Sequence, residues 1–274
     1  MIPPFVDAGF VDTHPEAVLA DVRWYLDGRD GKAAFEAGHI AGAVWVDLDH
    51  QLASHDRPAT DGRHPFPTPT AFAAAMGSLG IGNDSLVVAY DDTGGLTAGR
   101  LAVMLRMLGC DATVLAGGLK SWPGSVEIGP GRTPSAADFA PIDWPTDRLA
   151  GAQEVERIIA AGGTAIDARS QDRFVGEVVQ IDKRAGHIPG ARNAPWGDVL
   201  GTDGKPRTPE ALRRHYRALG ADDGHETVAY CGSGVSACMN VLAMEHAGLA
   251  APRLYVASWS GWSADPNREA ATGE

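Results

Sequence analysis

The chain has 274 residues, 44% of them hydrophobic, and a formal net charge of −12. This length exceeds what one compact core needs and suits two domains, and the composition is that of a globular chain rather than a disordered one. The acidic balance disfavours nucleic-acid and anionic-membrane partners, and the lack of a signal-peptide pattern or a long apolar run leads us to expect a cytoplasmic protein.

The first half of the chain alternates strand and helix signals. A short apolar segment ends in an acidic residue, a Gly-His-Ile turn follows, a Thr-Pro pair starts a helix, and a buried strand leads through a glycine loop into another helix. In chain order these signals are Asp21-Val22-Arg23, Gly38-His39-Ile40, Thr68-Pro69, 86–90, Asp91, Thr93-Gly94-Gly95 and 98–108. We expect the Pro-rich stretch 55–69 to be a loop inside this first domain.

The middle of the chain contains a connector. Residues 123–145 are rich in Pro and Gly and lack a sustained apolar period, which predicts a segment that runs over the surface. We therefore place the two domains at 1–125 and 149–274, with a linker at 126–148.

The second half shows the same order of signals. Thr208 suits a helix N-cap and Pro209 the first helical position, so a helix is predicted that ends near Gly220. A buried strand at 227–230 is predicted to lead into Cys231. Ser236 is predicted to cap the next helix, which would cover 237–247.

The two halves match as an internal repeat. Asp21-Val22-Arg23 resembles Asp167-Ala168-Arg169, and Gly38-His39-Ile40 recurs as Gly186-His187-Ile188. Further on, one constant spacing separates the pairs Gly80 and Gly220, Asp91 and Cys231, and Trp122 and Trp262. The alternation within each half predicts an α/β fold with a parallel sheet flanked by helices.

The segment Cys231-Gly232-Ser233-Gly234-Val235-Ser236 is the strongest candidate for chemistry. It lies between a predicted strand and a predicted helix, where open α/β sheets place their ligands. Gly232 and Gly234 allow the backbone to curl so that its N–H groups point at one anionic atom, and the helix adds its positive end. A cysteine in this setting is expected to react as a thiolate. A buried structural thiol is the alternative, which the two glycines disfavour.

The other two cysteines are expected to have structural roles. Cys238 lies seven residues beyond Cys231, two helical turns along, and is predicted to be a packed helix residue, with a resolving role as the weaker hypothesis. Cys110 follows the last helix of the first half and is predicted to be structural. Three unevenly spaced cysteines are too few for a disulfide framework or a four-ligand zinc site, so we expect no metal and no cofactor.

The cysteine loop resembles the active-site loop of 3-mercaptopyruvate sulfurtransferases, which belong to the rhodanese family. Thiosulfate-preferring rhodaneses usually carry Arg-Lys after the cysteine, where this chain has Gly232-Ser233. Gly186-His187-Ile188-Pro189-Gly190-Ala191 resembles the family's first signature, whereas the segment 255–262 departs from its C-terminal one. The resemblance covers essentially the whole chain and implies two tandem rhodanese-like domains, the first with Asp91 in place of the cysteine.

This resemblance also implies an activity. Cys231 would take a sulfur atom from 3-mercaptopyruvate as a persulfide and pass it to cyanide, a small thiol or thioredoxin. Cations would bind the donor's carboxylate and Ser233 would polarise its ketone, although a surface ion pair is the alternative for Arg173. Arg169 and His187 are expected to be structural. The residues implied in the site are Cys231, Ser233, Arg173, Arg184, Gly232, Gly234, Val235 and Ser236, with His39 and Asp30 as a relay to Ser233.

Three other functions compete with this interpretation. A thiosulfate:cyanide sulfurtransferase differs only in its donor. A non-enzymatic rhodanese-like module that binds a partner or senses redox state would need no persulfide. A cysteine phosphatase is disfavoured, because its loop needs an arginine where this chain has Ala237.

Overall fold

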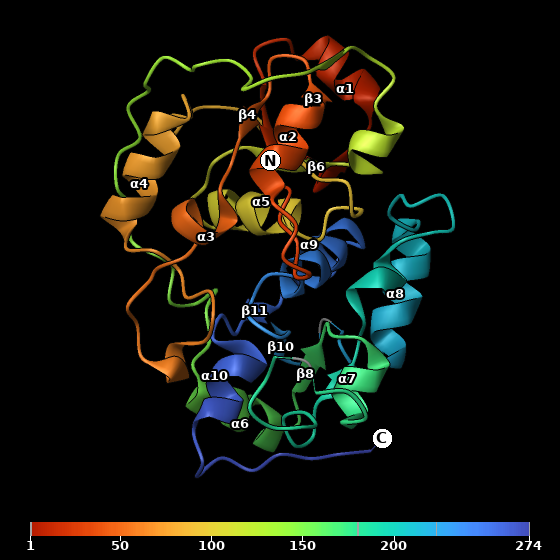
Figure 1. Ribbon diagram of the computed structural model, residues 1–274. Helices are drawn as coiled ribbons and strands as arrows, with labels where there is room; N and C mark the ends of the chain where they lie inside the picture. The colour runs from red at the N-terminus through yellow and green to blue at the C-terminus, as the bar shows by residue number, and fades with distance from the viewer. Residues whose placement is uncertain (1, 180, 223, 274) are drawn as a thin grey trace. The chain divides into compact units, whose positions relative to one another are not determined.

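The computed structural model describes residues 2–179, 181–222 and 224–273 (Figure 1). The chain forms two compact units, each of which combines segments that are distant in the sequence. Unit 1 consists of Met1–Ser54, Phe66–Trp144 and Thr202–Pro206. Unit 2 consists of His55–Pro65, Pro145–Gly201 and Arg207–Glu274.

Unit 1 is built on a parallel sheet with the strand order β1-β6-β5-β2-β4. Its strands are β1 (Phe5–Val6), β2 (Val18–Asp21), β4 (Val44–Trp45), β5 (Val87–Tyr90) and β6 (Ala112–Leu115). The α-helices are α1 (Ala8–Thr13), α2 (Gly31–Ala37), α3 (Leu48–Gln51), α4 (Pro69–Ser78) and α5 (Ala98–Met107), and Gly118–Ser121 forms a short 3-10 helix, η2. A separate antiparallel pair joins β3 (His39–Ile40) to β7 (Val126–Glu127).

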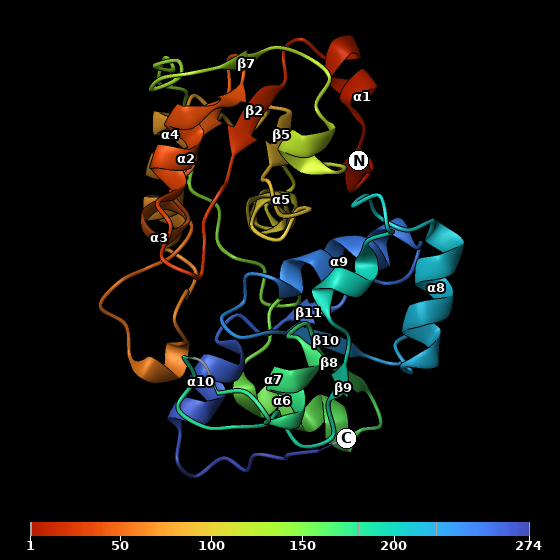
Figure 2. The ribbon, with the colours of Figure 1, turned by 45° about the vertical axis from the view of Figure 1, so that its right-hand side comes forward.

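Unit 2 repeats this plan with the strand order β11-β10-β8-β9, again parallel. Its strands are β8 (Thr164–Asp167), β9 (Arg192–Asn193), β10 (Thr227–Tyr230) and β11 (Arg253–Leu254). The helices are η1 (Ala59–Asp61), α6 (Ala152–Ala160), α7 (Gln171–Val175), η3 (Trp196–Val199), α8 (Pro209–Ala218), α9 (Ala237–His246) and α10 (Ser258–Ala264). Within this unit, α9 covers one face of the sheet and α6 covers the other (Figure 2). The prediction of two α/β repeats with parallel sheets is confirmed.

The repeat extends to buried side-chain contacts. In each unit an Arg–Asp pair closes the end of a central strand, and a tyrosine hydroxyl accepts the main-chain N–H of the isoleucine in the Gly-His-Ile turn. The matched contacts are Arg23–Asp21 and Arg169–Asp167 (2.7 Å each), Tyr90–Ile40 (3.0 Å) and Tyr230–Ile188 (3.2 Å). Removing one partner of such a buried ion pair typically costs about 3–5 kcal/mol, because the other charge stays behind unpaired.

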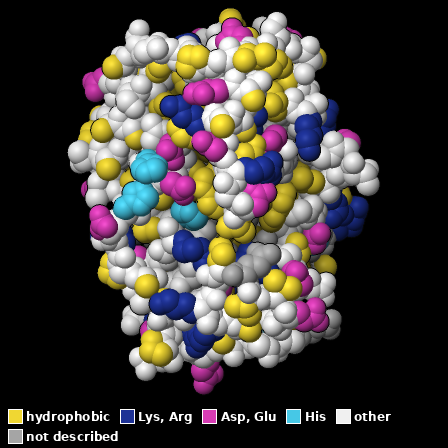
Figure 3. All heavy atoms as spheres, in the orientation of Figure 1, with side chains coloured by type: hydrophobic (Ala, Val, Ile, Leu, Met, Phe, Trp, Pro, Cys, Tyr) yellow, Lys and Arg dark blue, Asp and Glu magenta, His cyan; other side chains and the backbone are white. Residues whose placement is uncertain are grey.

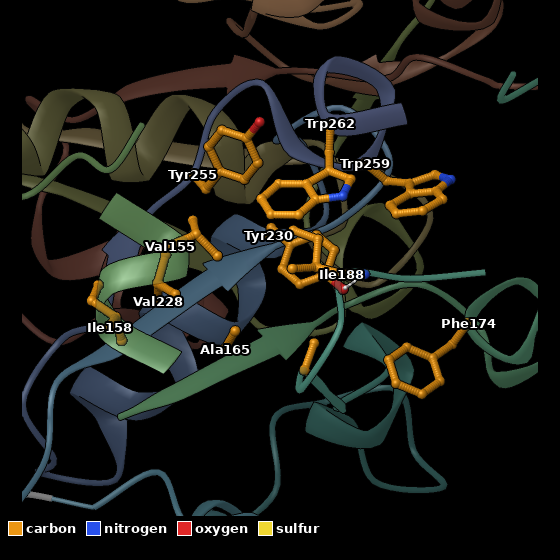
Figure 4. Packing of buried hydrophobic residues seen from close by; sticks show 11 residues of the cluster. Val155, Ile158, Ala165, Phe174, Ile188, Val228, Tyr230, Tyr255, Trp259 and Trp262 are labelled. Atoms are coloured by element: carbon orange, nitrogen blue, oxygen red, sulfur yellow. Dashed lines mark hydrogen bonds between the residues drawn. The ribbon is translucent and has the colours of Figure 1, made fainter. Parts of the chain in front are cut away.

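Aromatic side chains from α10 form the upper part of the core of unit 2. Trp259 and Trp262 pack in one cluster with Tyr230 at the end of β10, and Ile188 and Phe174 border them (Figure 4). Trp259 is fully buried. Truncating a buried tryptophan to alanine typically costs about 3–5 kcal/mol, so this cluster anchors α10 to the core of unit 2.

A local capping signal explains the start of α8 but not that of α9. The Thr208 hydroxyl accepts the N–H of Ala211, and Pro209 is the first residue of α8, as predicted. The prediction that Ser236 caps α9 is wrong, since its side chain makes no capping hydrogen bond. Ser236 already has helical backbone angles (φ −68°, ψ −20°), whereas a side-chain cap requires an extended residue.

Two connecting segments differ from the expectation. Residues 55–65 pack with unit 2 rather than inside the first domain, because η1 lies against α10. Within the expected linker, β7 pairs with β3, and Phe139 packs edge-on against Phe72. These apolar and main-chain contacts assign most of the linker to unit 1.

The charged side chains on the visible surface are mixed in sign (Figure 3). On the face shown in Figure 3, acidic and basic side chains are interspersed, and neither forms a continuous patch. Over the described residues, no helix is both long and apolar enough to cross a bilayer. The same residues contain no group of three or more His, Cys, Asp or Glu side chains arranged to hold a metal ion.

Candidate active site

The candidate site is the loop between β10 and α9 in unit 2. β10 ends at Tyr230, and the next residue, Cys231, is only 2% exposed. The Gly234 N–H donates a hydrogen bond to Cys231 Sγ over 3.1 Å. Gly234 has a φ of 76°, which glycine adopts without strain and which turns the loop back over the sulfur. The loop therefore curls around its own cysteine, as the two glycines predict.

The start of α10 is hydrogen-bonded to the loop. The Cys231 N–H donates to the hydroxyl of Ser258 over 3.0 Å, while the N–H groups of Trp259 and Ser260 donate to the carbonyl oxygens of Cys231 and Gly232, each over 2.9 Å. Ser258 has a φ of 53°, which is costly for a residue with a side chain and is maintained by this packing. The segment 255–262, which departs from the family's C-terminal signature, thus makes three hydrogen bonds with the loop.

Two arginines and an aspartate lie next to the loop. A Cβ placed on Gly232 would be 3.0 Å from a terminal nitrogen of Arg63 and 3.0 Å from one of Arg173, so glycine leaves room for both guanidinium groups. Asp182 joins them, with one carboxylate oxygen 2.5 Å from Arg63 and the other 2.6 Å from Arg173. Burial alone would raise the pKa of Asp182, but the hydrogen bonds and charges of the two arginines hold it below its ordinary value.

A histidine contacts the predicted catalytic serine. His64 Nδ1 lies 2.8 Å from Ser233 Oγ, and both residues are buried. The serine hydroxyl can either donate to this nitrogen or accept from it, depending on the tautomer of the imidazole. This pair gives the site a group that can hold and move a proton.

Arg184, predicted to bind the donor, is hydrogen-bonded to the main chain instead. The Arg184 guanidinium donates to the carbonyl oxygens of Trp262, Ser263, Asp265 and Arg268 over 2.7–3.3 Å. These four bonds hold the last turn of α10 and the residues that follow it, so they do not support a role for Arg184 in binding the donor.

The residues predicted to form the relay belong to unit 1. His39 is stacked on Phe35, with its Nδ1 2.9 Å from the carbonyl oxygen of that residue, and Asp30 caps α2 through the N–H groups of Lys32 and Ala33. Their role as a relay stays a prediction. Within unit 2, the hydrogen-bond partner found for Ser233 is His64.

The remaining residues occupy the positions their patterns indicate. His187 stacks on Phe174 and contacts its carbonyl oxygen, which agrees with a structural role. Cys238 lies buried on α9 and donates to the Gly234 carbonyl over 3.4 Å. Burial, with the charges of Asp84 and Asp111, raises the pKa of Cys110, as expected of an unreactive thiol.

Sequence reasoning missed Arg63, His64 and Asp182. Arg63 and His64 lie in a Pro-rich loop of the first half, and no periodicity or spacing links that loop to Cys231. The only available signal was the pair of adjacent cationic and titratable side chains in a loop, where functional residues are common. Asp182 follows a stretch whose length differs from the family pattern, and its two partners become visible only in the fold.

Comparisons with known proteins agree with this fold and loop. The model of the rhodanese-like domain matches residues 11–125 and 151–265, and the chain belongs to the rhodanese family. A probable 3-mercaptopyruvate sulfurtransferase of Pseudomonas aeruginosa is 40% identical over 96% of this chain and 94% of its own length. A putative thiosulfate sulfurtransferase, SseB, of Mycobacterium tuberculosis is 38% identical over 97% of this chain and 94% of its own.

Solved structures show the same family in three dimensions. The 3-mercaptopyruvate sulfurtransferase from Leishmania major aligns with a TM-score of 0.83 and 34% identity, over 94% of this chain and 73% of that one. The SseA structure from Escherichia coli, described as a 3-mercaptopyruvate sulfurtransferase with the rhodanese fold, aligns with a TM-score of 0.82 and 30% identity. That alignment covers 94% of this chain and 99% of the other.

Proposed function

We propose that the protein is a sulfurtransferase that takes sulfur from 3-mercaptopyruvate and carries it as a persulfide on Cys231. The observation that carries this proposal is the position of Cys231 Sγ, which accepts the N–H of Gly234 inside a loop flanked by Arg63 and Arg173. The names of the relatives from Pseudomonas aeruginosa, Leishmania major and Escherichia coli support the choice of donor.

The first step is an attack on sulfur. The Cys231 thiolate forms an S–S bond with the donor's sulfur, and the carbon–sulfur bond breaks with its electron pair moving onto carbon to give the enolate of pyruvate. The proton of the donor's thiol ends on that carbon, so one thiolate and one 3-mercaptopyruvate become one ionised persulfide and one pyruvate. Negative charge grows on the ketone oxygen during this step, and donors that meet it there lower the barrier.

The side chains of unit 2 fit this charge distribution. Arg173 and Arg63 offer guanidinium donors to the carboxylate, a contact for which arginine is well suited. The Nε of Arg173 is buried with no hydrogen-bond partner among the described residues, and it can donate to the substrate. The Ser233 hydroxyl, held by His64, is the group for the ketone oxygen, and His64 stabilises or supplies its proton.

The second step releases the sulfur. Cyanide attacks the outer sulfur and leaves as thiocyanate, while the electron pair of the S–S bond returns to Cys231 as the thiolate. A small thiol or the thiol of thioredoxin can accept the sulfur in the same way, leaving as a persulfide. We propose a reduced thiol as the acceptor of this protein.

A comparison of donors tests the proposal. We expect kcat/KM for 3-mercaptopyruvate, followed as pyruvate release, to exceed kcat/KM for thiosulfate, followed as sulfite release, with cyanide as the acceptor. A preference for thiosulfate would mean that thiosulfate, the donor in the name of the mycobacterial relative, is the donor of this protein instead. No turnover with either donor would favour a non-enzymatic module.

A further inference from the structure

The cluster of Arg63, Arg173 and Asp182 carries more positive than negative charge. The carboxylate of Asp182 is only 4% exposed and binds one arginine with each oxygen. Arg169 approaches Asp182 to 3.9 Å, but its guanidinium is paired with Asp167 at 2.7 Å. Three guanidinium groups and two carboxylates leave one net positive charge.

Other cations nearby do not change this balance. Hydrogen bonds to neutral carbonyl oxygens leave the charge of Arg184 in place, but they hold its guanidinium against the main chain of residues 262–268, whereas Arg63 and Arg173 contact Asp182. Lys183 lines a pocket of about 120 Å³ together with Arg63 and Asp182, but it is exposed, so solvent screens its charge. Among the described residues, the cluster therefore contributes one net positive charge beside the Cys231 loop.

We propose that Asp182 is a specificity-determining residue that restricts the site to donors with one negative charge. This inference rests on the proposed function, because it assumes that Cys231 takes sulfur from a small anionic donor. Near neutral pH, 3-mercaptopyruvate carries one charge, on its carboxylate, whereas thiosulfate carries two. Asp182 cancels one of the two charges that Arg63 and Arg173 present. The site also holds the Cys231 thiolate, so no further cation is left to meet the second negative charge of a dianion, and a dianion is disfavoured relative to a monoanion.

Thiosulfate can donate its sulfur to Cys231 by the same kind of attack. From thiosulfate, the thiolate takes the outer sulfur, the S–S bond of the donor breaks, and its electron pair leaves on sulfite. Since thiosulfate and sulfite both carry two negative charges, the cluster faces a dianion throughout this reaction. Asp182 therefore selects by charge rather than by reactivity.

The test changes the charge of the cluster without changing its size. We expect Asp182→Asn to raise the ratio of kcat/KM for thiosulfate to kcat/KM for 3-mercaptopyruvate about tenfold, the size of effect that one unit charge has at this range in a partly screened site. Arg63→Gln removes a positive charge and should move the same ratio in the opposite direction. Asp182→Glu keeps the charge and should leave the ratio within about twofold of the wild type.

Two controls separate charge from damage. Asp265→Asn makes the same change in net charge elsewhere in unit 2, near Arg268, and should leave the ratio unchanged. A variant that merely loosens the site would lower both kcat/KM values together, so an unchanged ratio in Asp182→Asn overturns the inference. A shift towards 3-mercaptopyruvate would overturn it as well.

A binding experiment keeps this test independent of turnover. In a Cys231→Ser background, which cannot form a persulfide, calorimetry should show that Asp182→Asn tightens thiosulfate binding about tenfold relative to pyruvate binding. Equal changes for both anions would contradict the inference. Failure of the proposed function would look different, since wild-type Cys231 would then gain no sulfur from either donor.

Discussion

The loops after β5 and β10 are two versions of one structure. Each follows a central strand of its sheet, and each turns at a glycine with positive φ, 81° at Gly94 and 76° at Gly234. In unit 1 the anion is built in: the Asp91 carboxylate accepts four main-chain N–H groups and one hydroxyl at 2.8–3.0 Å. In unit 2 the corresponding atom is Cys231 Sγ, which accepts the N–H of Gly234 at 3.1 Å.

The same backbone therefore serves stability in one unit and chemistry in the other. The N–H donors to Asp91 come from Thr93, Gly95, Thr97 and Ala98. By the repeat, their counterparts in unit 2 include the N–H groups of Ser233, Val235 and Ala237, which we expect to face the outer sulfur of a persulfide. A permanent carboxylate fills the first loop, whereas the second is left to bind a transient anion.

The largest expected effect comes from removing the thiol. Cys231→Ser should lower sulfur transfer by at least about a thousandfold, as loss of a covalent nucleophile generally does. In the double variant Cys231→Ser/Asp91→Cys, a thiol in the first loop should not restore turnover. Recovery of activity in the double variant would show that the two loops are functionally equivalent.

The next effect concerns stability. Asp91→Ala should reduce the free energy of unfolding by about 3–5 kcal/mol, since it leaves several buried N–H groups without their acceptor. Cys231→Ala should cost no more than about 1–2 kcal/mol, because it removes one weak acceptor. Urea titration of both variants measures the difference, and equal losses would contradict the distinction between the loops.

The proton-holding pair gives a smaller loss of activity. Ser233→Ala and His64→Gln should each lower kcat for 3-mercaptopyruvate about a hundredfold, the usual contribution of acid–base or polarising groups, and the pH profile of kcat should flatten. The double variant should be little worse than either single one. Ser78→Ala, on the exposed end of α4, is the matched control, and additive losses would argue against a joint role.

Variants of Arg184 and Arg173 should differ in whether they lower stability or raise KM for the donor. Arg184→Met should destabilise the protein by about 2–3 kcal/mol through its lost hydrogen bonds to half-buried carbonyl oxygens, with little change in KM for the donor. Arg173→Met should raise that KM with a smaller effect on stability. A large KM effect in Arg184→Met that survives correction for the folded fraction would restore it as a binding residue.

The smallest effect is a pH dependence of stability at His187. Burial lowers its pKa in the folded protein below the ordinary value, so as the pH falls below about 6.5 the unfolded chain binds the proton first and folding loses stability. The loss should be below about 1 kcal/mol between pH 7 and pH 5.5. His187→Gln should flatten this slope in urea titrations, whereas a steeper slope would contradict the assignment.

Much of the fold could be predicted because the repeat ties local patterns together. The strand at 227–230 and the helix starting at Thr208-Pro209 carry strong local signals, and the structure reproduces both. The match of Asp91 with Cys231 placed the two loops correctly. Strands of two residues, such as β4 and β9, are too short for any periodic pattern to reveal.

The missing parts of the site depend on contacts between distant segments. Nothing near Arg63 or His64 in the sequence indicates that 55–65 packs with unit 2, because that depends on how η1 fits against α10. The position of Arg184 before Gly186-His187-Ile188 predicts that it lies beside the substrate. Its actual partners are carbonyl oxygens, which no side-chain pattern marks.

The most direct test of the central claim is mass spectrometry of the cysteine-containing peptides after brief incubation with 3-mercaptopyruvate. We predict that Cys231 gains one sulfur atom and loses it on addition of cyanide. Neither Cys110 nor Cys238 should gain sulfur. An unmodified Cys231, or a sulfur carried on Cys238 instead, would contradict the account.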